Sequence, residues 1–145
     1  MAIQQLAQPA VSSCQWTAQY SVNVARLDDQ HKKLFEILGS LQQAMMARKG
    51  TDVISSIVSE LANYTKTHFA CEEGYLRMYG YPELEAHKKE HEIFVEKIRQ
   101  FQNDLAKGQV TLSLNVFRFL VDWLKNHILG TDKKYVPFLQ AKGVR

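Results

Sequence analysis

The sequence predicts an all-α protein, an up-down-up-down four-helix bundle with an extended N-terminal arm. Apolar residues recur at steps of three and four over four long stretches, which is the spacing of one helix face. Short breaks that contain Gly or Pro separate these stretches. Because short loops make consecutive helices antiparallel neighbours, the pattern favours an alternating bundle. No segment shows strand-like alternation over a useful length.

Each of the first two helices carries one histidine on its apolar face. The first face runs from Leu27 through His31 to Met45, and the helix ends at Lys49-Gly50. Thr51-Asp52 offers an N-cap for the second helix, which ends at Gly80. The face of this second helix consists of Ile54, Ile57, Val58, Leu61, His68, Glu72, Leu76 and Tyr79.

The third and fourth helices follow the same rules. Pro82 suits the first turn of the third helix, and Lys107-Gly108 ends it. The fourth helix runs from about Leu114 and breaks at Gly130. The face of the third helix consists of Leu84, His87, His91, Phe94, Ile98, Phe101 and Leu105, and that of the fourth includes Val116, Leu120, Trp123, Leu124 and His127.

The chain of 145 residues has the size of one domain. We expect residues 1–15 to form a flexible tail and residues 16–145 to form the bundle domain. The segment before about Tyr20 should pack on the outside of the bundle as an extended arm, with Trp16 as its anchor.

Composition and charge exclude several classes of protein. A net charge of +3, with Lys and Arg scattered among Asp and Glu, does not indicate a nucleic-acid surface. No apolar run approaches the ~20 residues that span a bilayer. The first residues lack the basic region of a signal peptide, and the two cysteines form no disulfide framework. A cytoplasmic location is therefore expected.

All five histidines occupy positions on predicted apolar helix faces, so their side chains should point into the bundle. They lie early in the first and third helices and late in the second and fourth. In an alternating bundle these positions fall at the same end. The sequence thus predicts that five imidazoles converge in one layer of the core.

A single histidine on an apolar face is more often a core residue bonded to a backbone carbonyl than a metal ligand. Five buried histidines together favour metal binding over ordinary core packing, because each unpartnered buried polar group costs about 1–3 kcal/mol. A whole domain is stable by only ~5–15 kcal/mol. Metal coordination removes this cost, since imidazoles and carboxylates are ligands of iron, zinc and copper.

The spacing defines a candidate ligand set that suits two octahedral ions better than one tetrahedral ion. His68 and Glu72 are four residues apart, as are His87 and His91, so each pair shares a helix face. Asp132 follows His127 by five residues, which on a regular helix turns it away by ~140°. Gly130-Thr131 should end or loosen the helix and let Asp132 turn back. The set is His31, His68, Glu72, His87, His91, His127 and Asp132, with Glu73 left as an outer partner or a surface residue.

With these residues in place, the sequence resembles the hemerythrin family, and within it the single-domain bacterial form. The resemblance extends from about Trp16 to Phe138. All seven candidate ligands occur in the family's order. The matching stretches are Trp16, Tyr20-Ser21-Val22, Asp28 to Phe35, His68 to Glu73, Gly80-Tyr81-Pro82, His87 to His91, and Trp123 to Ile128 with Asp132.

The resemblance implies a non-haem centre of two iron ions (Fe2+/Fe3+) with an oxo or hydroxo bridge. His87, His91 and His127 would bind one iron and His31 and His68 the other. Glu72 and Asp132 would bridge the two. The iron with two histidines would keep an open position. Leu34, Trp123 and Ile128 should line a dry pocket for dioxygen there, although ordinary core packing is an equally good interpretation of Leu34 and Trp123.

The implied function is reversible dioxygen binding, for storage, delivery or scavenging, without enzymatic activity. The absence of any Glu-x-x-His pair separates the chain from oxygen-activating di-iron bundles. A di-iron enzyme that acts on nitric oxide or peroxide and an oxygen sensor are the alternatives, and a zinc or purely structural site is a remote one. We expect a monomer, with dioxygen as ligand and an oxygen-consuming enzyme as the recipient.

Overall fold

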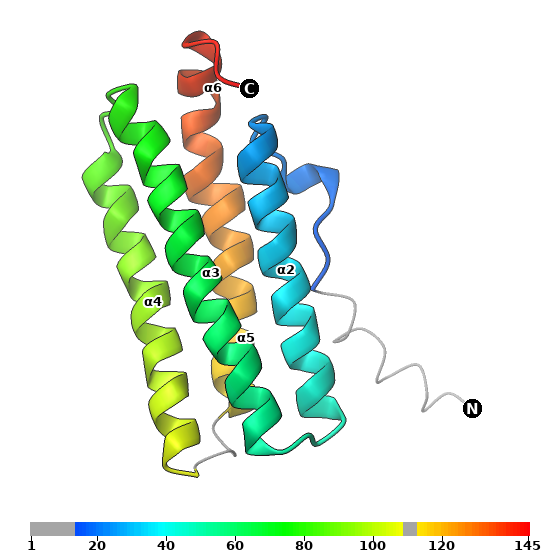
Figure 1. The fold of residues 1–145 in the computed structure, drawn as a ribbon. Helices are drawn as coiled ribbons and strands as arrows, with labels where there is room; N and C mark the ends of the chain where they lie inside the picture. Colours follow the sequence, from blue (N-terminus) through cyan, green and yellow to red (C-terminus); the bar gives the residue numbers. More distant parts are fainter. Residues whose placement is uncertain (1–13, 109–112) are drawn as a thin grey trace.

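A computed structural model describes residues 14–108 and 113–145 and shows long helices joined by short turns (Figure 1). The elements in chain order are η2 (Ala18–Tyr20), α2 (Ala25–Met46), α3 (Thr51–Met78), α4 (Leu84–Ala106), α5 (Ser113–Asn126), η4 (His127–Asp132) and α6 (Lys133–Ala141). The last three elements continue one another and form a single rod with three internal segments. Four rods therefore make the bundle, and the predicted all-α class is confirmed.

Consecutive rods pack against each other in antiparallel order (Figure 1). α2 contacts α3, α3 contacts α4, α4 contacts α5, and α5 returns to α2 to close the bundle. Gly80 ends α3 as predicted. It has a positive φ of 73°, a conformation that costs glycine nothing. The backbone N–H of Tyr81 then donates to the carbonyl of Leu76 at 2.8 Å, which closes the helix end.

Two predicted helix starts are shifted by one or two residues. α3 begins at Thr51, and Gly50 rather than Thr51 occupies its N-cap position without a side-chain bond. α4 begins at Leu84, so Pro82 lies in the preceding turn and not in the first helical turn. The turn closes when the N–H of Leu84 donates to the carbonyl of the buried Tyr81 at 3.3 Å.

The predicted break at Gly130 is wrong. His127–Asp132 forms a π-helical segment, and the rod continues through it into α6. A π-helix closes hydrogen bonds from residue i to i+5, so each turn holds about one residue more than an α-helical turn. The helix is thus loosened without being ended. Residues five apart remain on one face, which is the spacing of His127 and Asp132.

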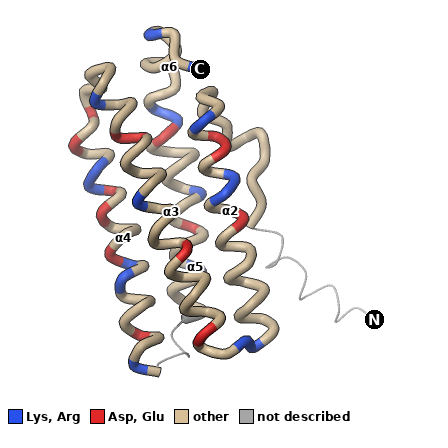
Figure 2. Tube along the Cα trace, viewed as in Figure 1, with Lys and Arg blue, Asp and Glu red and all other residues tan. Residues whose placement is uncertain are grey.

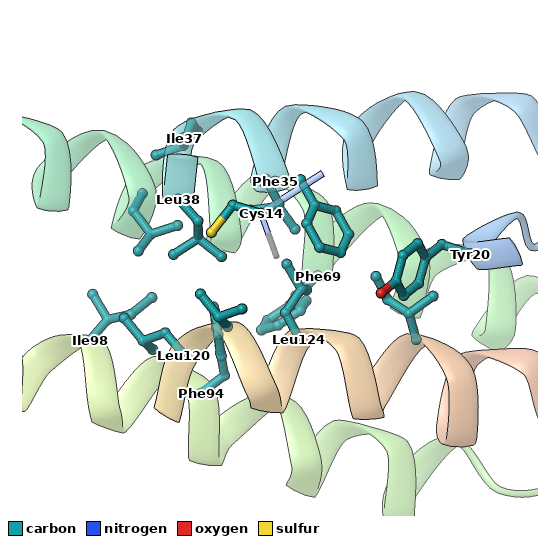
Figure 3. Close-up of a cluster of buried hydrophobic side chains, with 14 of the residues drawn as sticks. Cys14, Tyr20, Phe35, Ile37, Leu38, Phe69, Phe94, Ile98, Leu120 and Leu124 are labelled. Carbon is teal, nitrogen blue, oxygen red and sulfur yellow. The ribbon is translucent and has the colours of Figure 1, made fainter. Parts of the chain in front are cut away.

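The N-terminal arm lies beside α2 and joins the core (Figures 1 and 3). Trp16 is partly buried against the core and lies under the Lys32 ammonium group, 4.5 Å from the ring centroid. Its predicted anchoring role is confirmed. Cys14 is already buried, so the packed part of the arm includes at least this residue of the predicted tail. Residues 1–13 of that tail lie outside the described residues.

Acidic and basic residues are interspersed along the rods (Figure 2). The interior is filled by aliphatic and aromatic side chains from all four rods (Figure 3). Within residues 14–108 and 113–145, no helix combines the length and apolarity needed to cross a membrane.

Candidate metal centre

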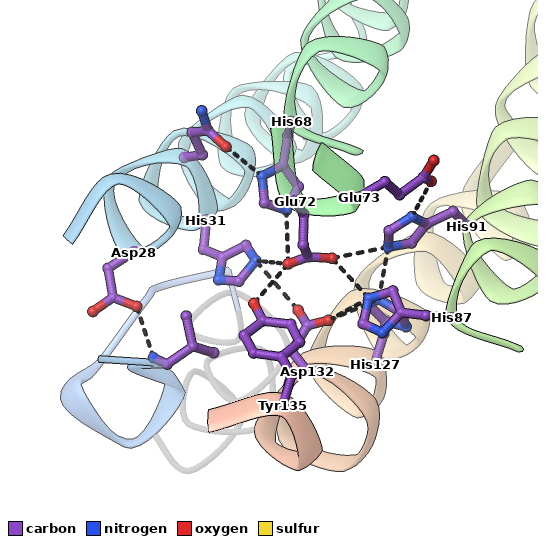
Figure 4. A network of polar contacts seen from close by, with 12 residues as sticks. Asp28, His31, His68, Glu72, Glu73, His87, His91, His127, Asp132 and Tyr135 are labelled. Atoms are coloured by element: carbon purple, nitrogen blue, oxygen red, sulfur yellow. Dashed lines mark hydrogen bonds and ion pairs between the residues drawn. The ribbon is translucent and has the colours of Figure 1, made fainter. Parts of the chain in front are cut away.

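The structure brings all seven predicted ligand residues into one buried cluster near one end of the bundle (Figure 4). They come from α2, α3, α4 and η4, so every rod contributes. None of them is more than 4% exposed. The prediction that histidines early in odd rods and late in even rods converge is confirmed.

The cluster divides into two groups of donor atoms that share Glu72. One group contains the larger number of histidines, and we call it the three-histidine set: Glu72, His87, His91, His127 and Asp132. The other, the two-histidine set, is His31, His68 and Glu72. Within each group the donor atoms lie within 4.8 Å of one another, which is close enough to surround one ion.

Glu72 faces both sets, with one carboxylate oxygen toward each. Its Oε1 lies 2.8 Å from His87 Nε2 and 3.0 Å from His91 Nε2, on the three-histidine side. Its Oε2 lies 3.6 Å from His31 Nε2 and 3.7 Å from His68 Nε2, on the other side. Such a carboxylate can hold two neighbouring cations, one with each oxygen.

Asp132 repeats this division. Its Oδ1 lies 3.0 Å from both His87 Nε2 and His127 Nε2, whereas its Oδ2 lies 3.3 Å from His31 Nε2. The π-helical turn makes this arrangement possible, because it keeps Asp132 on the same side of the rod as His127. The expectation that the helix loosens near Gly130 and lets Asp132 turn back to the cluster is therefore confirmed, although the helix does not end there.

Several buried donor atoms in the cluster have no hydrogen-bond partner among the described residues. They are both ring nitrogens of His31, Nδ1 of His87, and both carboxylate oxygens of Asp132. Leaving such groups unpartnered is costly in a protein interior. Nε2 of His31 and the two oxygens of Asp132 face the middle of the cluster, and lone pairs there fit coordination of metal ions.

The electrostatics of the cluster also favour a cation. Burial lowers the pKa of His31 and His87, but Asp132 and Glu72 outweigh it and raise these pKa values to about 9 and about 10. By contrast, burial and the nearby charge of His31 lower the pKa of His68 to about 3. Although burial opposes it, the surrounding histidines hold the pKa of Glu72 and Asp132 below the ordinary range. The two carboxylates thus create a negative potential that attracts positive charge.

Three of the imidazoles are held from outside the cluster by hydrogen bonds. His68 Nδ1 lies 2.7 Å from the amide oxygen of Gln30. His91 Nδ1 lies 2.7 Å from Glu73 Oε2, which confirms Glu73 as an outer partner. His127 Nδ1 lies 2.9 Å from Glu90 Oε1, and that oxygen also accepts a bond from the Thr131 hydroxyl at 2.7 Å. Bonds of this kind orient ligating histidines and raise their basicity.

Gln30, Glu90 and Tyr135 were not found from the sequence. The Tyr135 hydroxyl donates to Glu72 Oε2 at 2.8 Å and is fully buried. A signal was present for two of them, since Gln30 and Glu90 directly precede His31 and His91. Tyr135 gave no such signal, because it lies on the far side of the π-helical turn.

Replacing Tyr135 with Phe should lower the free energy of unfolding by about 1–3 kcal/mol, because it leaves a buried carboxylate oxygen without its donor. Urea unfolding of the metal-free protein measures this change. Tyr20→Phe is the matched control, since Tyr20 is buried and its hydroxyl forms no hydrogen bond within the described residues. Equal losses in the two variants would contradict the assigned role of Tyr135.

The three residues predicted to line an oxygen pocket lie in the core around the cluster. Leu34 and Ile128 are fully buried. Trp123 is partly buried and stacks on the ring of His127, with centroids 4.4 Å apart and planes 12° apart. Phe69, whose ring centroid lies 6.1 Å from that of Trp123, stacks on His91 at 3.7 Å. Aromatic rings thus cover two of the imidazoles, and the pocket role of the three residues stays a prediction.

Fold and site together define a four-helix-bundle metalloprotein with a buried, nitrogen-rich site for two ions. Residues 22–139 match the family described as the hemerythrin HHE cation binding domain. The chain belongs to the hemerythrin family.

Individual relatives agree with this assignment. The bacteriohemerythrin of Clostridium acetobutylicum is 33% identical over 126 residues, which cover 83% of this chain and 97% of that protein. The bacteriohemerythrin of Methylococcus capsulatus is 34% identical, with 87% of this chain and 96% of that protein covered. A wild-type hemerythrin crystal structure superposes with a TM-score of 0.77 at 34% identity, covering 84% of this chain and 94% of the other.

Proposed function

We propose that this chain binds dioxygen reversibly at a non-haem di-iron centre, for storage, delivery or scavenging of oxygen. Oxygen binding at a di-iron centre is the function that hemerythrins share, and this chain carries the family's domain over most of its length. One observation carries the proposal for the site: each of Glu72 and Asp132 directs one oxygen to the three-histidine set and the other to the two-histidine set.

We assign His87, His91 and His127 to one iron and His31 and His68 to the other. Glu72 and Asp132 would bridge the two ions together with an oxo or hydroxo group. This assignment is supported by the donor groups, by the unpartnered lone pairs and by the negative potential between the sets. The set with two histidines has one protein ligand fewer, so a position there stays available for dioxygen.

A bound pair of ferrous ions would supply the electrons for reversible dioxygen binding, one from each ion. The protein's contribution is to hold the site and keep it dry. Leu34 and Ile128 are fully buried and exclude water, while Trp123 covers one face of the His127 ring. Gln30, Glu73 and Glu90 fix the orientation of three imidazoles.

A binding role is favoured over an enzymatic one by the donor set. Five imidazoles and two carboxylates make a nitrogen-rich site. Such a site supplies less negative charge to oxidised metal than the carboxylate-rich sites of oxygen-activating bundles. We therefore infer that the chain is not an enzyme, and reduction of nitric oxide or peroxide is the outcome that would contradict this.

The visible spectrum of the reduced, iron-loaded protein tests the proposal. It is recorded without oxygen, then in air, then after degassing. A charge-transfer band that appears in air and disappears on degassing over repeated cycles is expected. A band that decays within seconds, or steady consumption of added nitric oxide, would favour the enzyme.

Leu34→Ala should keep both irons and speed the irreversible oxidation of the oxygen-loaded protein several-fold, because the cavity admits water. Leu41→Ala is the control, as Leu41 is equally buried two turns further along α2. Both variants should lose about 2–5 kcal/mol of stability. If they also oxidise at the same rate as each other, Leu34 is ordinary core and no part of the pocket.

We further propose a monomer located in the cytoplasm that delivers dioxygen to an oxygen-consuming enzyme. The mixed surface charge in Figure 2 supports a solvated exterior and gives no sign of a nucleic-acid site. Sedimentation of the iron-loaded protein measures the oligomeric state.

A further inference from the structure

The outer hydrogen-bond partners differ between the two histidine sets. In the three-histidine set, the outer nitrogens of His91 and His127 face the carboxylates of Glu73 and Glu90. In the two-histidine set, the corresponding partner of His68 is the neutral amide of Gln30. The outer nitrogens of His31 and His87, one in each set, have no partner among the described residues. The two sets therefore differ in the charge of the groups that hydrogen-bond to their outer nitrogens.

The two carboxylates keep contact with solvent, and the amide does not. The side chain of Glu73 is 19% exposed and borders a surface groove between α3 and α4 that also reaches Phe69. The side chain of Glu90 is 40% exposed and borders a second groove, beside Trp123. An ionised carboxylate is an acceptor that also carries negative charge. Gln30 is buried, and it offers an acceptor without a charge.

A charged acceptor on the outer nitrogen strengthens an imidazole as a metal ligand. It forms a charge-assisted hydrogen bond and pushes electron density toward the nitrogen that faces the metal. Loss of such a partner typically weakens metal binding by about 10–100-fold. Two histidines of one set have this support, whereas neither histidine of the other set does.

We propose that the two metal positions are unequal, and that Glu73, Glu90 and Gln30 are positioning residues that set the difference. The position of the three-histidine set fills first and holds its ion more tightly. The position of the two-histidine set fills second and is the first to lose its ion. The inference rests on the ligand assignment proposed above and adds an order of loading to it.

Titration of the metal-free protein with cobalt(II) tests the order. Calorimetry should resolve two binding events of different affinity. After one equivalent, proton magnetic resonance should show three strongly shifted exchangeable imidazole protons, one from each histidine of the three-histidine set. Two such protons would place the first ion in the other set and overturn the inference.

Variants separate the effect of the outer partners from that of histidine number. Glu73→Gln and Glu90→Gln should each weaken the first event about tenfold or more and leave the second unchanged. Gln30→Glu, which is nearly isosteric, should strengthen only the second event by a similar factor. Glu96→Gln is the control, because this exposed carboxylate of α4 pairs with Arg99 and contacts no histidine.

The remaining outcomes are also decisive. Two equal events in the natural chain, or variants that change both events alike, would overturn the inference and leave the proposed function standing. Binding of fewer than two cobalt ions by the natural chain would instead contradict the proposed di-iron site, and the inference with it.

Discussion

Removal of both irons is expected to lower the melting temperature by roughly 6–18 °C. His31 and Asp132 hold buried atoms that face the centre of the cluster without hydrogen-bond partners, and each such group costs about 1–3 kcal/mol without metal. The sum, roughly 2–6 kcal/mol, is a large part of the ~5–15 kcal/mol that stabilises a domain. In a chain of this size, each kcal/mol shifts the melting temperature by about 3 °C.

Circular dichroism of the loaded and the chelator-treated protein measures this shift. Anaerobic addition of iron(II) to the chelated sample is the control and should restore the original melting curve. An unchanged melting temperature after verified loss of both irons would show that the buried groups find partners without metal, and would refute the stabilising role of the site.

His91→Ala should reduce the iron content of the fully loaded protein from about two ions to about one or fewer per chain. The change removes a nitrogen of the proposed ligand set, leaves Glu73 without its partner and opens a gap beside Phe69. We also expect a loss of helicity, because the site connects all four rods. Elemental analysis and circular dichroism on the same sample measure both effects.

Ile98→Ala separates loss of a ligand from loss of packing. Ile98 is buried on α4, two turns beyond His91, and its truncation should cost about 2–5 kcal/mol. The variant should nevertheless retain about two irons. If His91→Ala also retained two irons, His91 would be a core residue and not a ligand.

The convergence of the ligands could be predicted because it depends only on periodicity and chain order. Helix periodicity placed each histidine on an inward face, and the alternation of rods placed His31 and His127 at the same end. These arguments need no knowledge of side-chain contacts. Helix boundaries depend on local turn geometry, so the starts near Thr51 and Pro82 were shifted by one or two residues.

The outer partners could not be predicted because they join different rods. Spacing along one helix shows which face a residue occupies but not what faces it across the bundle. A rule is nevertheless visible in the structure: Gln30, Glu73 and Glu90 each stand next to a ligand on their own helix. Each then bonds to a histidine of the next rod. A polar residue beside a ligand is thus a signal for such a bond.

The wide turn between His127 and Asp132 determines which side chains of the following helix, α6, face the interior. One additional residue in a turn shifts the following helix by about 100° relative to a regular one. Tyr135 and Leu139 face the interior because of this offset. Deleting a single residue between positions 128 and 131 would cancel the offset and rotate the whole C-terminal segment outward. In this part of the chain, the number of residues is therefore under as strict a constraint as their chemistry.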